Sequence, residues 1–153
     1  MVFLAVGTQK QDFSRLFKLV ENSKALKDEE IIAQAGYTKY TSNKIKIKSF
    51  LPKEEFRKYF ESADYIICHG GVGTIFDGLY NGKKILAVPR LAKYKEHVND
   101  HQIQICKQLE DDGYILYYKD GEDFDKKIDE LKSRKFKKYV TDESFLDILR
   151  KEI

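Results

Sequence analysis

Hydrophobic residues gather in short, nearly uninterrupted runs along the chain, and these runs alternate with segments of helical spacing. A run that is apolar at almost every position is typical of a strand buried on both faces of a sheet. Most of the runs are followed closely by glycine or proline, which are common where strands end. We expect strands over residues 2–6, 31–35, 45–47, 65–68, 85–88 and 115–117.

The segments between these runs carry apolar residues three or four positions apart, which predicts helices. Strands separated by helices imply a parallel sheet covered on both faces. The pattern therefore predicts an α/β fold, with a doubly wound, mainly parallel six-stranded sheet of Rossmann-like type. A chain of 153 residues fits one such domain, over residues 1–153. The last predicted helix, over residues 141–153, is amphipathic; it either docks on a partner chain or packs on its own sheet.

The charges are nearly balanced, with 28 basic and 25 acidic residues and a net charge of +3. This balance gives no argument for binding nucleic acid. Seven basic residues nevertheless crowd positions 126–138. Two interpretations are open for this cluster: a solvated helix face, or a contact for an anionic membrane surface or an acidic partner.

The two cysteines, Cys68 and Cys106, stand far apart in apolar surroundings. They are expected to be buried free thiols in a reducing compartment, and their spacing does not suggest a zinc site. Neither a signal peptide nor a run of ~18 apolar residues is visible. We therefore expect a cytoplasmic protein that reaches the inner face of the membrane through a partner.

The segment with the clearest chemistry is His69-Gly70-Gly71-Val72-Gly73-Thr74, which joins a predicted strand to a predicted helix. Glycines let the backbone approach a ligand, and the amides at a helix N-terminus favour phosphate. Thr74 adds a hydroxyl, and Asp77 lies one turn further along, where its carboxylate can accept from a ribose. A tight turn without a ligand is the alternative.

Two familiar phosphate motifs do not fit this region. The dinucleotide-binding fingerprint requires a third glycine where Phe76 stands. The P-loop requires a serine or threonine after Gly-Lys, but Gly82-Lys83 is followed by Lys84 and comes after a helix.

A second polar segment, Glu96-His97-Val98-Asn99-Asp100-His101-Gln102, follows the fifth predicted strand and therefore lies at the same edge of the sheet. Six polar residues around one valine do not suggest core packing, and they offer the donors and acceptors that a sugar requires. The alternative is a polar loop with a helix cap at Asn99 or Asp100. Val98 stands where a zinc-protease motif needs glutamate. Asp123-Phe124-Asp125 mimics a metal-binding DxD motif but is expected on a charged helix face.

On these residues the chain resembles the C-terminal, donor-binding domain of family 28 GT-B glycosyltransferases. The resemblance also covers Gly7-Thr8, Gln34–Tyr37 and Pro89-Arg90. Single-domain members are most similar: the soluble subunit of the eukaryotic dolichol-linked N-acetylglucosaminyltransferase and, more closely, the PssE-like subunits of bacterial exopolysaccharide and capsule synthesis.

The resemblance implies a role for each matching position. The donor diphosphate would be held at Gly7, Thr8, Gly70, Gly71, Val72, Gly73 and Thr74. Asp77 would bind the ribose, although the family usually has the longer glutamate there, and the Phe50-Leu51 backbone would face the uracil. Asn99, Asp100, His101 and Gln102 would hold the sugar. His69 would be a catalytic residue that adds a proton or charge near the diphosphate.

The acceptor-binding half of the two-domain enzymes is absent from this chain. The resemblance therefore implies a hexosyltransferase subunit that uses UDP-galactose, UDP-glucuronic acid or UDP-N-acetylglucosamine and transfers the sugar to a lipid-linked saccharide with inversion. A membrane-associated, PssD-like chain would supply the acceptor site and the catalytic base; no metal or other cofactor is expected. Two rivals are a non-catalytic UDP-sugar-binding enhancer of a catalytic partner and a sugar-nucleotide epimerase.

Overall fold

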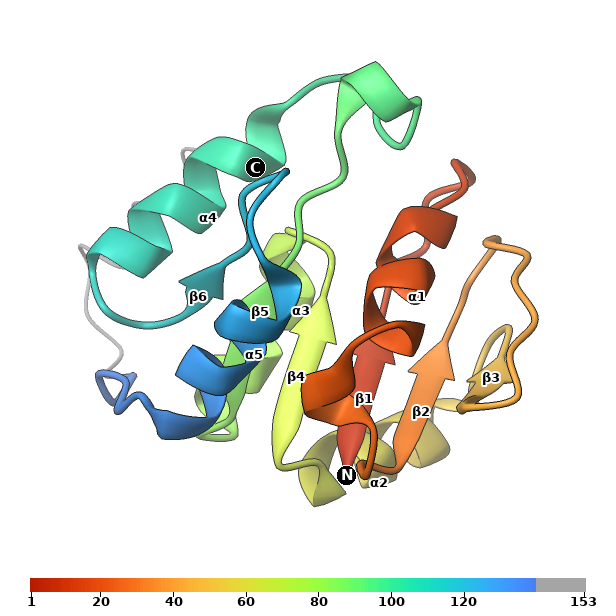
Figure 1. Ribbon diagram of the computed structural model, residues 1–153, viewed down its shortest axis with the longest axis horizontal. Helices are drawn as coiled ribbons and strands as arrows, with labels where there is room; N and C mark the ends of the chain where they lie inside the picture. Colours follow the sequence, from red (N-terminus) through yellow and green to blue (C-terminus); the bar gives the residue numbers. More distant parts are fainter. Residues whose placement is uncertain (140–153) are drawn as a thin grey trace.

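A computed structural model describes residues 1–139. Within them a six-stranded, fully parallel sheet has the order β3-β2-β1-β4-β5-β6 (Figure 1). This is the order of a doubly wound Rossmann-like fold, and it confirms the predicted fold class. The strands are β1 (Val2–Ala5), β2 (Ile31–Gln34), β3 (Ile45–Lys48), β4 (Tyr65–Cys68), β5 (Lys84–Ala87) and β6 (Leu116–Tyr117).

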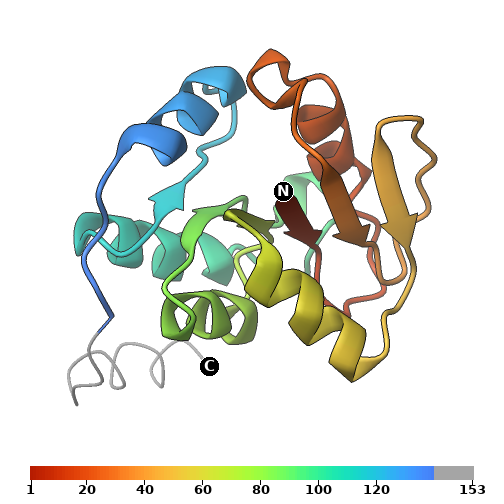
Figure 2. The same ribbon diagram turned by 90° about the horizontal axis from the view of Figure 1, so that it is seen from below.

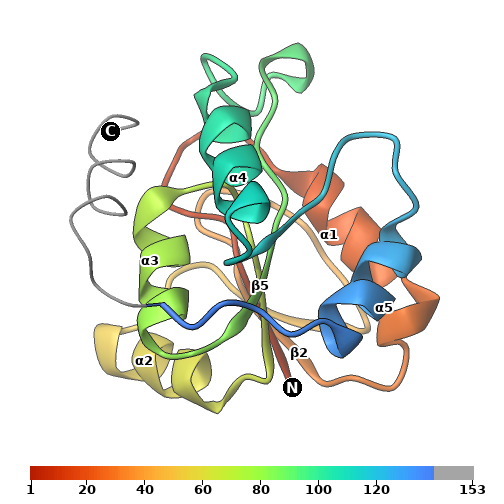
Figure 3. The same ribbon diagram turned by 90° about the vertical axis from the view of Figure 1, so that its left-hand side faces the viewer.

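Helices cover both faces of the sheet (Figures 2 and 3). On one face α1 (Ser14–Glu21) and α5 (Phe124–Ser133) pack on the first apolar core. On the other face α2 (Lys53–Ser62), α3 (Val72–Tyr80) and α4 (His101–Asp111) enclose the second. Two short 3-10 turns, η1 (Lys24–Leu26) and η2 (Ala92–Tyr94), lie in the connections.

All six predicted strands are found within residues 1–139, with ends that differ from the prediction by at most one position. The apolar runs predict the strands well because β1, β4 and β5 lie in the middle of the sheet, where both faces are covered. The edge strand β3 has the weakest pattern, since only Ile45 in it is fully buried. The predicted helix over residues 141–153 lies outside the described residues.

Both cysteines are buried and free, as the sequence predicted. Burial raises the pKa of the Cys68 thiol to about 12 and raises that of Cys106 well above its ordinary value. Thiols with such pKa values are poor nucleophiles, so neither cysteine belongs to a reactive site. Among the described helices, none has the length and apolar character needed to cross a bilayer.

Candidate functional site

Two loops meet at the carboxyl edge of the sheet, where β4 leads into α3 and β5 leads towards α4. A pocket of about 200 Å³ lies between them. The glycine segment and the polar segment, 32 positions apart between Gly70 and Gln102, therefore form one site. The pocket is lined by Gly70, Gly71, Val72, His97, Asn99, His101, Gln102 and Ile105.

His69 fills the space between two of the glycines. A Cβ atom on Gly7 or on Gly71 would overlap the imidazole ring, so only glycine fits at either position. Gly7 also has a φ of 80°, in the left-handed region that favours glycine. The His69 ring therefore lies between the β1–α1 loop and the glycine loop, and its size sets the distance between these two loops.

The imidazole of His69 is neutral in the folded protein. Burial, together with the charges of Arg90 and His97, lowers its pKa to about 3. Its Nδ1 accepts a hydrogen bond from the Gly71 amide at 3.0 Å, which places the proton of the neutral ring on Nε2. We therefore correct the expectation that His69 adds positive charge beside a diphosphate, because a buried neutral ring cannot supply it.

The glycine loop offers fewer free amides than the sequence suggested. The Gly70 amide donates to Gln102 Oε1 at 3.2 Å, and the Gly71 amide donates to His69. Both donors are thus used within the protein, in contrast to the expectation that they bind diphosphate. The amides of Val72, Gly73 and Thr74 form the first turn of α3, where helix geometry leaves N–H groups without intrahelical acceptors. These three amides are the ones that can face an anion.

Two members of the polar segment are buried, which corrects the expectation that none of it is core material. Glu96 is only 3% exposed and forms a two-point ion pair with Arg15, with N–O distances of 2.9 and 3.0 Å. Gln102 is 9% exposed, and its Oε1 also accepts from the Arg90 amide at 3.0 Å. Gln102 therefore shapes the site mainly through its carbonyl oxygen, which is not available to a sugar hydroxyl.

The other three predicted sugar residues differ in their freedom to bind a ligand. Asn99 Oδ1 accepts from the His101 amide at 3.0 Å, although the N-cap residue of α4 is Asp100. Asp100 Oδ1 accepts from the Ala92 amide at 2.9 Å, and Asp100 does not line the pocket. The exposed imidazole of His101 and the carboxamide nitrogens of Asn99 and Gln102 are polar groups available at this side of the pocket.

The residues assigned to the ribose and the uracil lie apart from this pocket. Asp77 is exposed on α3 and lines a different pocket of about 390 Å³ between α2 and α3, with Lys53 and Arg57. The Leu51 amide donates to Gln34 Oε1 at 2.7 Å, so this part of the predicted uracil contact is already used. Phe50 is half exposed and packs edge to face on Tyr37, a partner that sequence reasoning missed.

Arg90 is a structural residue of the site to which the sequence assigned no role. Its guanidinium is fully buried and lies over the Phe13 ring. It donates to the carbonyl oxygens of Gln11 and Val6, both at 2.7 Å, and of Glu96 at 3.1 Å. Arg90 thereby ties the β1–α1 loop to the β5–α4 connection. A charged residue directly after the apolar run of β5 was the signal that could have revealed it.

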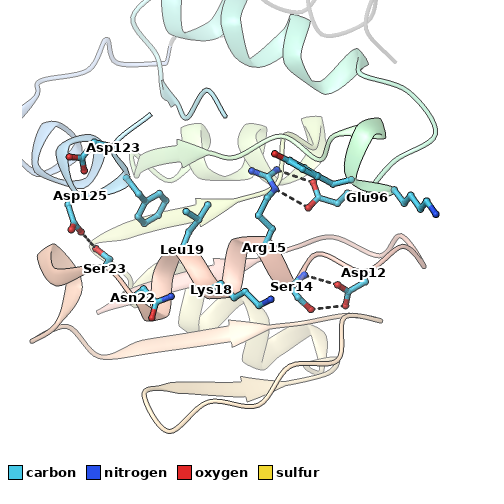
Figure 4. A pocket seen from close by; sticks show the side chains of 13 residues that line it. Asp12, Ser14, Arg15, Lys18, Leu19, Asn22, Ser23, Glu96, Asp123 and Asp125 are labelled. Atoms are coloured by element: carbon cyan, nitrogen blue, oxygen red, sulfur yellow. Dashed lines mark hydrogen bonds and ion pairs between the residues drawn. The ribbon is translucent and has the colours of Figure 1, made fainter. Parts of the chain in front are cut away.

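A larger pocket, of about 640 Å³, lies on the opposite face between α1 and α5. Figure 4 shows that its polar side chains point toward one another: Arg15 pairs with Glu96, and Ser23 pairs with Asp125. These interactions connect α1 to its neighbours. The larger pocket is lined by the carboxylates of Asp12, Glu96, Asp123 and Asp125, which disfavour an anionic ligand, whereas no acidic side chain of the described residues lines the smaller pocket. We therefore place the functional site at the smaller pocket.

The fold and this site together define a Rossmann-like domain with a glycine loop at the point where the strand order reverses, between β1 and β4. The chain belongs to the glycosyltransferase family 28 C-terminal domain family, which it matches over residues 1–149.

Curated relatives are subunits of one kind of enzyme. The chain is 28% identical over 109 residues to the UDP-N-acetylglucosamine transferase subunit ALG13 of Candida albicans, a match that covers 71% of this chain and 35% of the relative. It is 27% identical over 127 residues to human ALG13, covering 76% and 11% of the two chains. The chain thus matches about a third or less of each relative.

Solved structures with a similar fold are also glycosyltransferases. The glycotransferase of kitacinnamycin superposes with a TM-score of 0.61 at 18% identity, over 99% of this chain and 37% of that one. SnogD from Streptomyces nogalater gives a TM-score of 0.52 at 20% identity, over 78% and 32%. At such identities the likeness establishes the fold and does not extend to residue roles.

Proposed function

We propose that this chain is the donor-binding subunit of an inverting glycosyltransferase that moves a hexosyl unit from a UDP-sugar to a lipid-linked saccharide. The observation that carries the proposal is the pocket where Val72, the first residue of α3, lies opposite the polar start of α4, with Gly73 and Thr74 next along the same helix turn. Amides and helix dipole favour a diphosphate, and the α4 side offers hydrogen-bonding groups for a sugar. A PssE-like role in exopolysaccharide or capsule synthesis is part of this proposal.

The leaving diphosphate is stabilised in this proposal by backbone groups and without a metal ion. Val72, Gly73 and Thr74 present three amides at the positive end of the α3 dipole, and the Thr74 hydroxyl can add a fourth donor. These donors are fixed before the reaction, so they need little reorganisation as negative charge develops on the leaving group. The Phe50 and Tyr37 rings, with Asp77 further along α3, are our candidates for the nucleoside side.

The size of the pocket supports a requirement for a second chain. Small-molecule sites usually enclose ~300–1,000 Å³, and 200 Å³ is too little for a whole UDP-sugar. The name of the relatives, "transferase subunit", agrees with a shared site. We propose that a membrane-associated, PssD-like chain closes the donor pocket, binds the acceptor and supplies the base that deprotonates the acceptor hydroxyl. The chain would then act at the cytoplasmic face of the membrane.

Three UDP-sugars are candidates for the donor substrate. The relatives are named for UDP-N-acetylglucosamine, whereas the resemblance to exopolysaccharide subunits favours galactose. Both donors and UDP-glucuronic acid are therefore to be compared in the same titration.

The test is calorimetric titration of the chain with UDP and these UDP-sugars in the presence of a chelator. We expect binding without metal, weakened about ten-fold or more by Gly71→Ala, since the new methyl group overlaps the His69 ring. The control is Gln104→Ala, at an exposed position of α4 that does not line the pocket, which should bind within about three-fold of the wild type. If neither the chain alone nor the chain co-expressed with its partner binds UDP, the proposal is wrong.

The second candidate function is a non-catalytic enhancer subunit. The activity of the wild-type chain with its partner is the reference for testing it. An enhancer should keep the activity of the pair when Asn99 and His101, which line the pocket, are both changed to alanine. A donor-binding subunit should lose most of it.

A further inference from the structure

The basic residues near the C-terminal end of the described chain fall into two groups. Lys127 and Lys132 are partnered by acids: Lys127 lies within 4.0 Å of Glu110, Glu122 and Glu130, and Lys132 lies 3.4 Å from Glu29. Their charges are therefore used to hold α5 to its surroundings. The lysines that follow α5 behave differently.

After α5 the chain crosses the edge of the sheet from one face to the other, as Figure 3 shows. Phe136 packs on the core beneath α1 and α5, and Tyr139 packs on the opposite core. The Lys137 amide donates to the Gly113 carbonyl at 2.9 Å, which fixes the segment near the C-terminus of α4. Because Phe136 and Tyr139 point inwards, Lys135, Lys137 and Lys138 are left exposed between and beside them.

These three lysines meet two others around an exposed aromatic ring. A pocket of about 530 Å³ is lined by Lys83, Lys84, Lys135, Lys137 and Lys138, and by Tyr80, which is 58% exposed. We call these six residues the basic–aromatic surface. Within residues 1–139 no acidic side chain lines this pocket, and none of its five lysines forms an ion pair.

Lys83 and Lys84 are hydrogen-bonded to backbone carbonyl groups and not to carboxylates. The Lys83 ammonium donates to the carbonyl oxygens of Glu61 and Ala63, and the Lys84 ammonium donates to that of Lys132. Carbonyl groups hold the ammonium groups in place without neutralising them. The nearby carboxylate of Asp64 is itself ion-paired with the N-terminal amine at 2.7 Å.

We propose that the basic–aromatic surface is a second binding site, which contacts a membrane surface rich in anionic lipid headgroups. The five lysines, which form no ion pair within residues 1–139, supply the electrostatic attraction. Tyr80 supplies an amphipathic ring, and such rings are common at the headgroup level of membranes. The ring packs on Phe76, with ring centroids 4.5 Å apart, so little side-chain entropy is lost when it binds.

This contact does not depend on the donor site. Tyr80 and Lys84 lie at the amino ends of the strands, where α3 ends and β5 begins, whereas the donor pocket lies at the carboxyl ends. The surface would hold the chain at the membrane in addition to any anchoring through a partner.

The test measures sedimentation of the full chain with vesicles of phosphatidylcholine, alone or mixed equally with phosphatidylglycerol. The test variant changes Lys135, Lys137 and Lys138 together to glutamine. The matched control changes Lys24, Lys27 and Lys39, which are exposed on other parts of the surface, and so removes the same charge. UDP titration and thermal melting of both variants separate this site from the donor site and from misfolding.

We expect binding to the mixed vesicles only, declining steeply as salt rises above about 0.1 M. Each lysine near the surface is worth about five-fold in partitioning, so the test variant should lose about 100-fold and the control much less. Tyr80→Ser should lose a further few-fold. Equal losses in test and control variants would reduce the effect to net charge and overturn the proposal. Absence of binding to the mixed vesicles, or an acidic protein as the sole ligand, would also overturn it.

Discussion

The Oε1 atom of Gln102, at the start of α4, accepts a hydrogen bond from the Gly70 amide in the loop before α3. The same oxygen accepts from the Arg90 amide, so one side chain satisfies two buried donors. We predict that Gln102→Leu lowers the free energy of unfolding by about 2–4 kcal/mol, because each orphaned amide costs ~1–3 kcal/mol. Urea denaturation measures this, and Gln104→Leu on the exposed side of α4 is the control. A loss no larger than that of the control would contradict the assigned role.

Arg90 should not tolerate replacement by lysine. The guanidinium donates to three carbonyl groups in different loops, and a single ammonium group cannot reach all of them. Arg90→Lys should destabilise the protein by about 3 kcal/mol or more and weaken UDP binding, because hydrogen bonds from charged donors are worth ~1.5–3 kcal/mol each. Arg57→Lys, on the exposed side of α2, should leave the free energy of unfolding unchanged. Chemical denaturation and calorimetry of both variants give the answer.

His69 should make stability depend on pH in the acid range. Its pKa is about 3 in the folded chain and near 6.5 when unfolded, so the unfolded state binds the extra proton between these values. Stability should be complete above about pH 6.5 and should fall by up to ~1.4 kcal/mol per pH unit as the pH drops toward 3.

His69→Gln should lack this part of the pH dependence, whereas His101→Gln, at an exposed position, should keep it. Denaturation curves at several pH values are the measurement. An NMR titration in which the His69 ring protonates between pH 5 and pH 8 would contradict the prediction.

The acidic pair in Asp123-Phe124-Asp125 should matter for stability and not for donor binding. Asp123 caps α5 through a hydrogen bond from the Lys126 amide, and Asp125 accepts from the Ser23 hydroxyl and the Ala25 amide. Asp125→Ala should cost about 1–3 kcal/mol and leave UDP affinity unchanged with or without Mn²⁺.

The control for this change is Asp129→Ala, at an exposed position on the same helix. A fall in UDP affinity that occurs only when Mn²⁺ is present would instead favour a metal-dependent role for the pair.

The sequence predicts most of the backbone because the signals for it are local. Buried strands such as β1 and β4 show as apolar runs, and the glycines after them mark the edge where ligands bind in such sheets. The partners of polar groups are not local. In the sequence, Glu96 and Gln102 resemble surface residues. In the structure they are buried because Glu96 pairs with Arg15, and Gln102 accepts from the amides of Gly70 and Arg90.

The sequence by itself therefore determined the parallel α/β fold, the meeting of the glycine and polar segments at one edge, and the resemblance to a sugar-transferase domain. Only the tertiary structure decided which of those groups are free: the amides of Gly70 and Gly71 are used, and those that begin α3 are not. It also separated the lysines paired with acids from those left exposed around Tyr80. The physical reason is that strand and helix patterns repeat over a few residues, whereas hydrogen bonds join residues as many as 107 positions apart.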